Sequence, residues 1–166
     1  MLKHLYSLKQ VFLLNVIVPS LVTSIRSSAF FGCISLEKME LPFLGPSDVE
    51  YGCTNKKEYL GYIFGAIASV DNDEYVPSTL KEIVVMRGQI IEDLAFYKCA
   101  NITSIVLPNS VKIIETAVFG ECPNLLVYCE VETKPEKWVI KENSFANIYW
   151  AGEWEYDEEE KPVPLI

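Results

Sequence analysis

An internal repeat constrains the fold of this chain more than any other feature of its sequence. Aliphatic residues recur in triplets of the form L-x-x-I-x-V, and these triplets start at Leu13, Leu36, Leu80, Ile102 and Leu125. The starts are 23, 44, 22 and 23 residues apart, so the period is 22 to 23 residues with one double-length interval. Periods of this length are typical of solenoids, in which short coils stack and share one continuous core.

Each triplet predicts one short strand of a parallel ladder, with the triplet residues facing the core. The expected strands span residues 13–18, 36–41, 80–85, 102–107 and 125–130. Because successive side chains of a strand point to opposite faces, the residues between the triplet positions are expected to face outward. These outward residues are Lys38, Glu40, Glu82, Val84, Ser104, Val106, Val127 and Cys129.

A second motif lies between the strands, where an Ile precedes a Phe by five residues and a Cys follows that Phe by three. It occurs as Ile25/Phe30/Cys33, Ile91/Phe96/Cys99 and Ile114/Phe119/Cys122. Apolar residues three to four apart suit one helical turn, so each copy predicts a short helix or 3₁₀ turn that plugs its coil. The three cysteines are expected to be buried, and the direction of their Cβ atoms decides whether Cys99 and Cys122 can form a disulfide.

The combined unit, P-x-x-V/L-x-x-I…A-F-x-x-C-x-x-L-x-x-I-x-L, resembles the BspA-like leucine-rich repeat at residues 19–41 and 108–130. The resemblance implies an α/β fold, a leucine-rich-repeat solenoid of parallel ladder strands with short helical turns. It also implies an extracellular or cell-surface protein of the adhesion or interaction class. Two positions depart from the pattern, because Val118 replaces the usual Ala and Glu130 stands where a strand should end in Leu or Ile. Both departures predict that the repeat pattern weakens in the last coil.

Two segments are expected to lie outside the regular coils of a solenoid that spans residues 13–130. Residues 1–12 carry leucines at near-helical spacing and predict an N-terminal cap or truncated coil, with a poorly matching signal peptide as the alternative. Residues 43–79 contain several Gly and Pro and predict a loop-rich insertion that interrupts the solenoid without ending it. Its acidic run at 71–74 lacks the ligand spacing of a calcium loop and is expected to be a solvated turn.

Residues 131–166 differ in composition from the repeat, because they hold all three tryptophans and an acidic run. Large aromatic side chains could bury the exposed edge of a last coil, which predicts an aromatic C-terminal cap. From Asp157 onward the chain is acidic and contains two prolines, so a disordered tail is expected.

Charge and residue content disfavour several function classes. With 14 Lys and Arg against 23 Asp and Glu, and a net charge of −9, the chain lacks the basic surface that nucleic-acid binding needs. It has no apolar run of about 18 residues that could span a bilayer as a helix. The sole histidine, His4, lies in the N-terminal segment, and the sequence has neither a phosphate loop nor a CxxC pair.

The sequence therefore predicts a non-catalytic protein-binding or adhesion module that needs no cofactor or metal. Its candidate contact surface is the outward ladder face, at Lys38, Glu40, Glu82, Val84, Ser104, Val106 and Val127. Because the chain is acidic, the expected partner is a neutral or basic protein, such as a host or bacterial surface protein. One alternative is a carbohydrate-binding surface at Trp138, Trp150 and Trp154, and another is a structural spacer within a longer repeat array.

Overall fold

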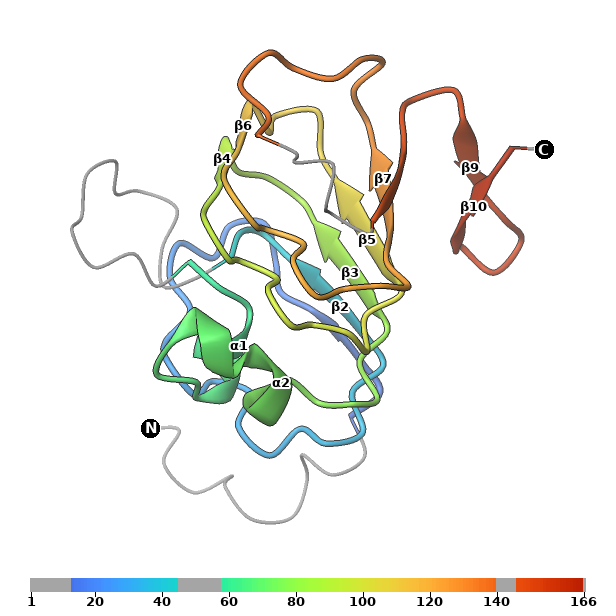
Figure 1. The fold of residues 1–166 in the computed structure, drawn as a ribbon. Coiled ribbons are helices and arrows are strands. Elements are labelled where there is room, and N and C mark those ends of the chain that lie inside the picture. Colours follow the sequence, from blue (N-terminus) through green and yellow to red (C-terminus); the bar gives the residue numbers. More distant parts are fainter. Residues whose placement is uncertain (1–12, 45–57, 140–145, 166) are drawn as a thin grey trace.

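The computed structural model describes residues 13–44, 58–139 and 146–165, so the expected cap at residues 1–12 lies outside the described residues. Within these ranges, parallel strands form a six-stranded sheet in the order β1-β2-β3-β5-β7-β8 (Figure 1). The strands are β1 (Asn15–Ile17), β2 (Lys38–Leu41), β3 (Glu82–Val85), β5 (Ser104–Leu107), β7 (Leu126–Cys129) and β8 (Asn147–Tyr149). Each strand belongs to one coil, and the coils stack as a solenoid, as the repeat predicts.

The inward residues of β2, β3 and β5 form the centre of the core. Met39, Ile83 and Ile105 pair in register along the sheet and are fully buried. The other triplet residues of these three coils are buried as well, namely Leu36, Leu41, Leu80, Val85, Ile102 and Leu107. The burial of these residues confirms the predicted register in these strands. Stacking places the equivalent residue of every coil in one continuous apolar column.

A second, shorter parallel ladder closes another side of the coils. Strand β4 (Ile90–Ile91) pairs with β6 (Ile113–Ile114), and a bridge between Ile114 and Trp138 extends the ladder by one coil. Ile91 and Ile114 begin two copies of the Ile-Phe-Cys motif, and both are buried.

The helical turn expected at the Ile-Phe-Cys motif is wrong, because all three copies form runs of β-turns. In the second copy the N–H groups of Ala95, Tyr97 and Cys99 each donate to the carbonyl three residues earlier, over 3.0–3.2 Å. Two non-helical residues with positive φ recur four positions apart in each copy, at Ser28 and Gly32, at Leu94 and Lys98, and at Ala117 and Glu121. These left-handed residues prevent a continuous right-handed helix.

Stacking explains why turns replace the helix. The N–H groups of Leu94, Phe96 and Lys98 donate to carbonyls of the next coil, those of Thr116, Val118 and Gly120, over 2.9–3.3 Å. A helix bonds its N–H groups internally beyond its first turn, so these groups would not all be free to donate to the next coil. The alternation of bonds within a turn and bonds along the stack satisfies the backbone of both coils.

The double-length interval is one enlarged coil, which agrees with an insertion that does not end the solenoid. Helix α1 (Gly61–Phe64) occupies the place of the missing motif, because Ser28 N–H donates to the Tyr62 carbonyl and Phe30 N–H to the Ile63 carbonyl. The ring of Phe64 packs 6.2 Å from that of Phe30, as Phe96 packs 5.9 Å from Phe119 in the regular coils.

The acidic run of the insertion forms a pair of short helices and not the expected turn, while Asp73 and Glu74 are exposed to solvent as expected. A 3₁₀ helix, η2 (Ser69–Asp71), leads into α2 (Asn72–Tyr75), and the Asn72 side chain is fully buried. Asn72 Oδ1 accepts from the Gly61 N–H over 2.8 Å, and Nδ2 donates to the Tyr97 carbonyl over 2.8 Å. One side chain thus joins α1 and α2 to the following coil.

The expected register of the last predicted strand, 125–130, is wrong by one residue. Val127 pairs with Ile105 and Cys129 with Leu107, and both are completely buried, so neither faces outward. The outward residues of β7 are Leu126 and Tyr128. Since the side-chain period of a strand is two, a slip of one residue exchanges its faces. Glu130 follows the strand and does not have to fill a core position.

The ladder also continues past residue 130, one coil further than expected. Strand β8 pairs in parallel with β7, and Ile148 lies in register with Val127. The described chain then ends in an antiparallel hairpin of β9 (Trp154–Tyr156) and β10 (Pro162–Pro164), so the disordered tail expected from Asp157 is wrong. Asp157 Oδ1 accepts from the N–H groups of Glu159 and Lys161 and so holds the hairpin turn.

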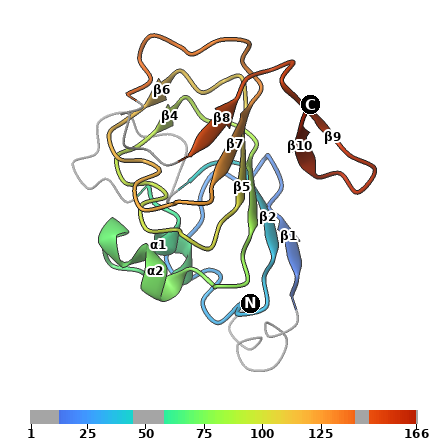
Figure 2. The ribbon, with the colours of Figure 1, turned by 45° about the vertical axis from the view of Figure 1, so that its right-hand side comes forward.

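The hairpin and the helices of the insertion lie on different sides of the sheet. In both Figure 1 and Figure 2 the β9–β10 hairpin stands apart from α1 and α2, across the ladder strands. None of the described helices is long and apolar enough to cross a membrane.

Candidate functional site

The outward face of the ladder carries two rows of side chains in register. We call the row nearer the strand starts the polar row, and it consists of Asn15, Lys38, Glu82, Ser104, Leu126 and Asn147. Two residues further along each strand lies the apolar row, which consists of Ile17, Glu40, Val84, Val106, Tyr128 and Tyr149. Neighbouring strands place these side chains about 4.8 Å apart along each row.

The hairpin docks on the apolar row at its C-terminal half. The Tyr128 ring stacks on Tyr149 with centroids 5.4 Å apart and lies 5.4 Å from the Trp154 ring. Trp154 Nε1 donates to the Cys129 carbonyl over 3.0 Å. As a result Tyr128 is only 2% exposed although it points outward, and burial raises the pKa of its hydroxyl.

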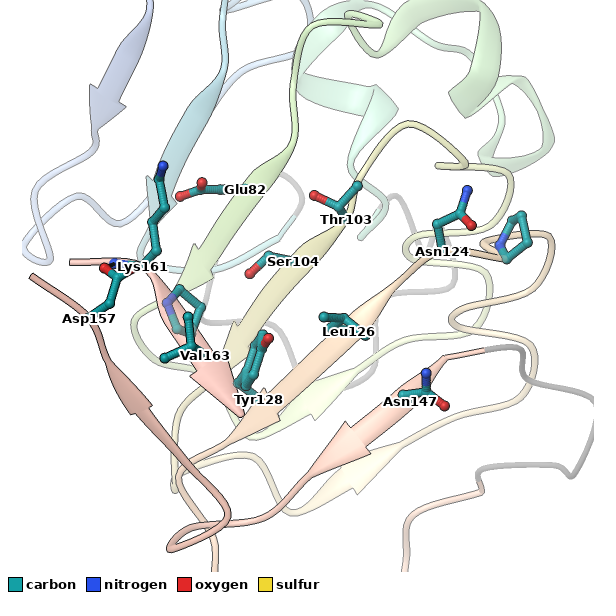
Figure 3. A pocket seen from close by; sticks show the side chains of 12 residues that line it. Glu82, Thr103, Ser104, Asn124, Leu126, Tyr128, Asn147, Asp157, Lys161 and Val163 are labelled. Atoms are coloured by element: carbon teal, nitrogen blue, oxygen red, sulfur yellow. Dashed lines mark hydrogen bonds between the residues drawn. The ribbon is translucent and has the colours of Figure 1, made fainter. Parts of the chain in front are cut away.

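A groove remains between the hairpin and the polar row, with a volume of about 430 Å³ (Figure 3). We call it the hairpin groove. Its floor is formed by Glu82, Ser104, Leu126 and Asn147, one from each of four adjacent strands, with Tyr128 beside them. Thr103, Pro123 and Asn124 line the side where the strands begin, and Asp157, Lys161, Pro162 and Val163 form the hairpin wall.

Charged groups of the hairpin lie close to the acids of the ladder. Lys161 Nζ contacts Glu159 at 2.8 Å, and its pKa is raised first by this hydrogen bond and then by the nearby carboxylates, Glu82 among them. Burial raises the pKa of Tyr156, and the carboxylates of Glu130 and Glu40 raise it further. The hairpin therefore reaches from the last coils toward β2 and β3.

The structure supports the outward orientation of most predicted contact residues and contradicts that of one. Lys38, Glu40, Glu82, Val84 and Ser104 point outward and are half-buried. Val106 belongs to the outward apolar row but is 2% exposed, so it offers little contact area. Val127 is inward and has no place in a contact surface. Whether the five half-buried residues bind anything stays a prediction.

Several groove residues were not identified from the sequence. Leu126 was missed through the register slip, and Asn147 because the ladder was expected to end at residue 130. Asp157 and Lys161 were assigned to a disordered tail. The register of β7 carried a usable signal, since aligning Val127 and Cys129 with the core avoids placing the charge of Glu130 there.

The three tryptophans pack against other parts of the chain and form no common open platform. Trp138 is 3% exposed, and its ring lies 5.6 Å from that of Trp150, which packs partly buried on the end of the core. Trp154 anchors the hairpin as described. Their burial near the last coil fits the expected cap better than a surface for stacking sugars.

The three thiols of the Ile-Phe-Cys motif and the thiol of Cys129 are buried and protonated at neutral pH. Cys33, Cys99, Cys122 and Cys129 are free, so Cys99 and Cys122 are not bridged, whereas Cys53 lies outside the described residues. Burial raises the pKa of all four, to about 11 for Cys122 and about 12 for Cys129. Cys122 Sγ donates to the Phe96 carbonyl over 3.1 Å. Neutral buried thiols are neither nucleophiles nor ready metal ligands.

Acidic side chains and thiols do not converge on a common point. Among the residues that the structure describes, no three His, Cys, Asp or Glu side chains are placed to hold a metal ion.

This chain matches a solved structure and a family model. A T. pallidum leucine-rich-repeat protein of known crystal structure is 23% identical, with a TM-score of 0.34, and the match covers 70% of this chain and 58% of that one. This chain thus spans less than two thirds of that protein. No curated protein matches the sequence. The family model for the BspA type leucine-rich-repeat region matches in six copies, over residues 5–53 and 69–153. The chain belongs to the BspA-type leucine-rich-repeat family.

Proposed function

We propose that this chain is a non-catalytic interaction module that binds a protein partner through the part of the ladder face left open by the hairpin. Membership of a leucine-rich-repeat family suggests an interaction or adhesion module. The observation that carries the proposal is the set of outward, half-buried side chains on β2 and β3, namely Lys38, Glu40, Glu82 and Val84. These belong to two adjacent strands in register and form one continuous surface.

The chemistry of this surface favours a neutral or basic partner. Lys38 Nζ lies 3.7 Å from Glu40 Oε1, with both side chains about a quarter exposed, so part of the charge is internally paired. Glu82 adds a second acid, and the whole chain carries a net charge of −9. Opposite charge on a partner would steer its approach and speed association. By the family resemblance, we place this interaction at the cell surface or outside the cell.

Charge reversal tests the proposal once a partner has been isolated by pull-down from host and bacterial surface material. The test variant is Glu40→Lys/Glu82→Lys, and the control is Glu132→Lys/Glu136→Lys, which makes the same charge change at exposed positions away from the ladder face. At low salt the test variant should associate roughly tenfold more slowly, with the control close to wild type. Both should keep their melting temperatures within a few degrees.

The salt dependence separates surface charge from loss of fold. Slower association of the test variant should fade as ionic strength rises, because exposed charges are screened over about 10 Å at 0.1 M salt. A test variant that binds as fast as wild type at low salt would rule out the β2–β3 surface as the contact site.

A further inference from the structure

The hairpin groove has the form of a binding site for a linear ligand that crosses the strands. Its floor residues Glu82, Ser104, Leu126 and Asn147 occupy the same register position on four consecutive strands of the ladder. A ligand lying across this row would meet one new side chain about every 4.8 Å. The groove volume of about 430 Å³ falls in the range of known small-ligand sites.

The groove offers three uncharged polar groups beside the carboxylate of Glu82. Among the described residues, the side chains of Ser104, Asn124 and Asn147 form no hydrogen bond, and all three line the groove. A hydroxyl or a carboxamide both donates and accepts hydrogen bonds. A ligand rich in hydroxyl groups, which also donate and accept, can pair with all three and can donate to the carboxylate of Glu82.

Two of the three charged groups that line the groove already have partners. Asp157 Oδ1 accepts two backbone hydrogen bonds in the hairpin turn, and Lys161 Nζ is bonded to Glu159. Opposite charges therefore line the same wall, and neither sign dominates it. With Glu82 on the floor, the groove is lined by two carboxylates and one ammonium group, which disfavours an anionic ligand.

Apolar surface completes the match. Leu126 lines the floor of the groove, and Pro162 and Val163 line its wall; Figure 3 shows Leu126 and Val163 on either side of Tyr128. The C–H faces of a pyranose ring can pack on such side chains while its hydroxyl groups reach the amides. An extended peptide advances about 3.3 Å per residue and falls out of step with the strands, whereas one pyranose unit is close to one strand spacing.

We propose that the hairpin groove binds a short, uncharged, extended glycan with β-1,4 linkages. This site adjoins the protein-binding surface proposed on β2 and β3 and shares Glu82 with it, and it does not use the tryptophans as a platform. The polar row and the amides would hold the sugar hydroxyl groups, and the hairpin would form the second wall.

Calorimetry and saturation-transfer NMR with defined tetrasaccharides test the proposal on the full chain. The probes are chitotetraose and cellotetraose, with maltotetraose as the curved α-1,4-linked comparison and a basic decapeptide as the alternative class of ligand. At least one β-1,4 probe should bind, and maltotetraose should bind at least several-fold more weakly.

Matched asparagine variants locate the binding. Asn124→Ala/Asn147→Ala should weaken the bound β-1,4 probe roughly tenfold, from the loss of two amides. Asn101→Ala/Asn109→Ala, which removes two exposed amides outside the groove, should stay within twofold of wild type. Ser104→Phe, which fills the middle of the floor, should abolish binding while leaving circular dichroism unchanged.

Three results would overturn the proposal. One is that neither β-1,4 probe binds, and another is that the groove and control variants bind the probe equally. The third is that the basic peptide binds and loses its affinity in the groove variant, which would assign the groove to a protein partner. None of these variants changes Lys38, Glu40, Glu82 or Val84, so failure here leaves the proposed protein-binding surface standing.

Discussion

Substituting Asn72 tests how the insertion is joined to the repeat. Its side chain is completely buried and makes two hydrogen bonds of 2.8 Å, from the Gly61 N–H and to the Tyr97 carbonyl. Asn72→Ala leaves the Gly61 N–H and the Tyr97 carbonyl without a hydrogen-bond partner. An unmet buried polar group costs about 1–3 kcal/mol, and the Tyr97 carbonyl can regain water because its bond is only part-buried. We expect a loss of about 2–4 kcal/mol, a large share of the 5–15 kcal/mol typical of a domain.

Urea denaturation followed by circular dichroism and tryptophan fluorescence measures this loss. The matched control is Asn101→Ala, an exposed amide in a turn, which should change the free energy of unfolding by less than about 0.5 kcal/mol. Asn72→Asp sharpens the test, since the carboxylate can still accept from Gly61 but cannot donate to Tyr97. It should be at least as destabilising as alanine.

The result that refutes this reasoning is a small effect of Asn72→Ala, equal to that of Asn101→Ala. Hydrogen exchange distinguishes a local from a global loss. If Asn72 holds only the insertion, amides of α1 and α2 should lose protection while those of β3 and β5 keep it.

Three further outcomes follow from the core, the turns and the hairpin. Phe96→Ala should cost about 3–5 kcal/mol in thermal melts, because Phe96 is fully buried and stacks on Phe119; a loss below about 0.5 kcal/mol would contradict its place in the core. Lys98→Gly should be neutral or stabilise by up to about 1 kcal/mol, because φ at Lys98 is 59° and the equivalent residue of the first coil is Gly32. Lys112→Gly, at a position outside the positive-φ set, should instead destabilise by about 1 kcal/mol, and equal losses would refute the turn argument. Truncation after Tyr156 should expose Tyr128 and increase dye binding to apolar surface, because it removes β10; unchanged dye binding would mean that β10 does not keep the hairpin docked.

The repeat made the fold predictable because equivalent residues of successive coils occupy the same environment. Met39, Ile83 and Ile105 hold one core position in three coils, and each copy strengthens the assignment of the others. The same argument identified the buried cysteines. It also placed the insertion within the stack, since the regular pattern resumes at Leu80 with its register intact.

The turns were mispredicted because the motif spacing is shared by two structures. Apolar residues three to four apart suit a helical turn, and they suit successive β-turns of four residues equally well. What separates them is hydrogen bonding between coils, such as Phe96 N–H to the Val118 carbonyl. That bond exists only in the stack, so no single copy of the motif reveals it.

The register of strand β7 was mispredicted because its sequence alone fits two registers. Both Val127 and Tyr128 are apolar, so hydrophobicity alone allows either register. Pairing with Ile105 buries Val127 and leaves Tyr128 outward, where Trp154 covers it. The hairpin that supplies Trp154 looked disordered by composition, since its turn carries four consecutive acids at residues 157–160. Its order comes from docking on a distant strand, which local composition does not record.

The two rows of the ladder face explain why the β9–β10 hairpin covers part of the apolar row and forms a groove over the polar row. Residues two apart on a strand point the same way, so each strand offers the hairpin one residue of each row. Where the apolar row ends in Tyr128 and Tyr149, Trp154 finds aromatic partners and a free carbonyl at Cys129. The polar row lacks such partners and stays open beneath the hairpin. The wall and the floor of the groove therefore depend on separate residues, so a change at Trp154 should displace the wall while the row of Ser104 and Asn147 keeps its register in the sheet.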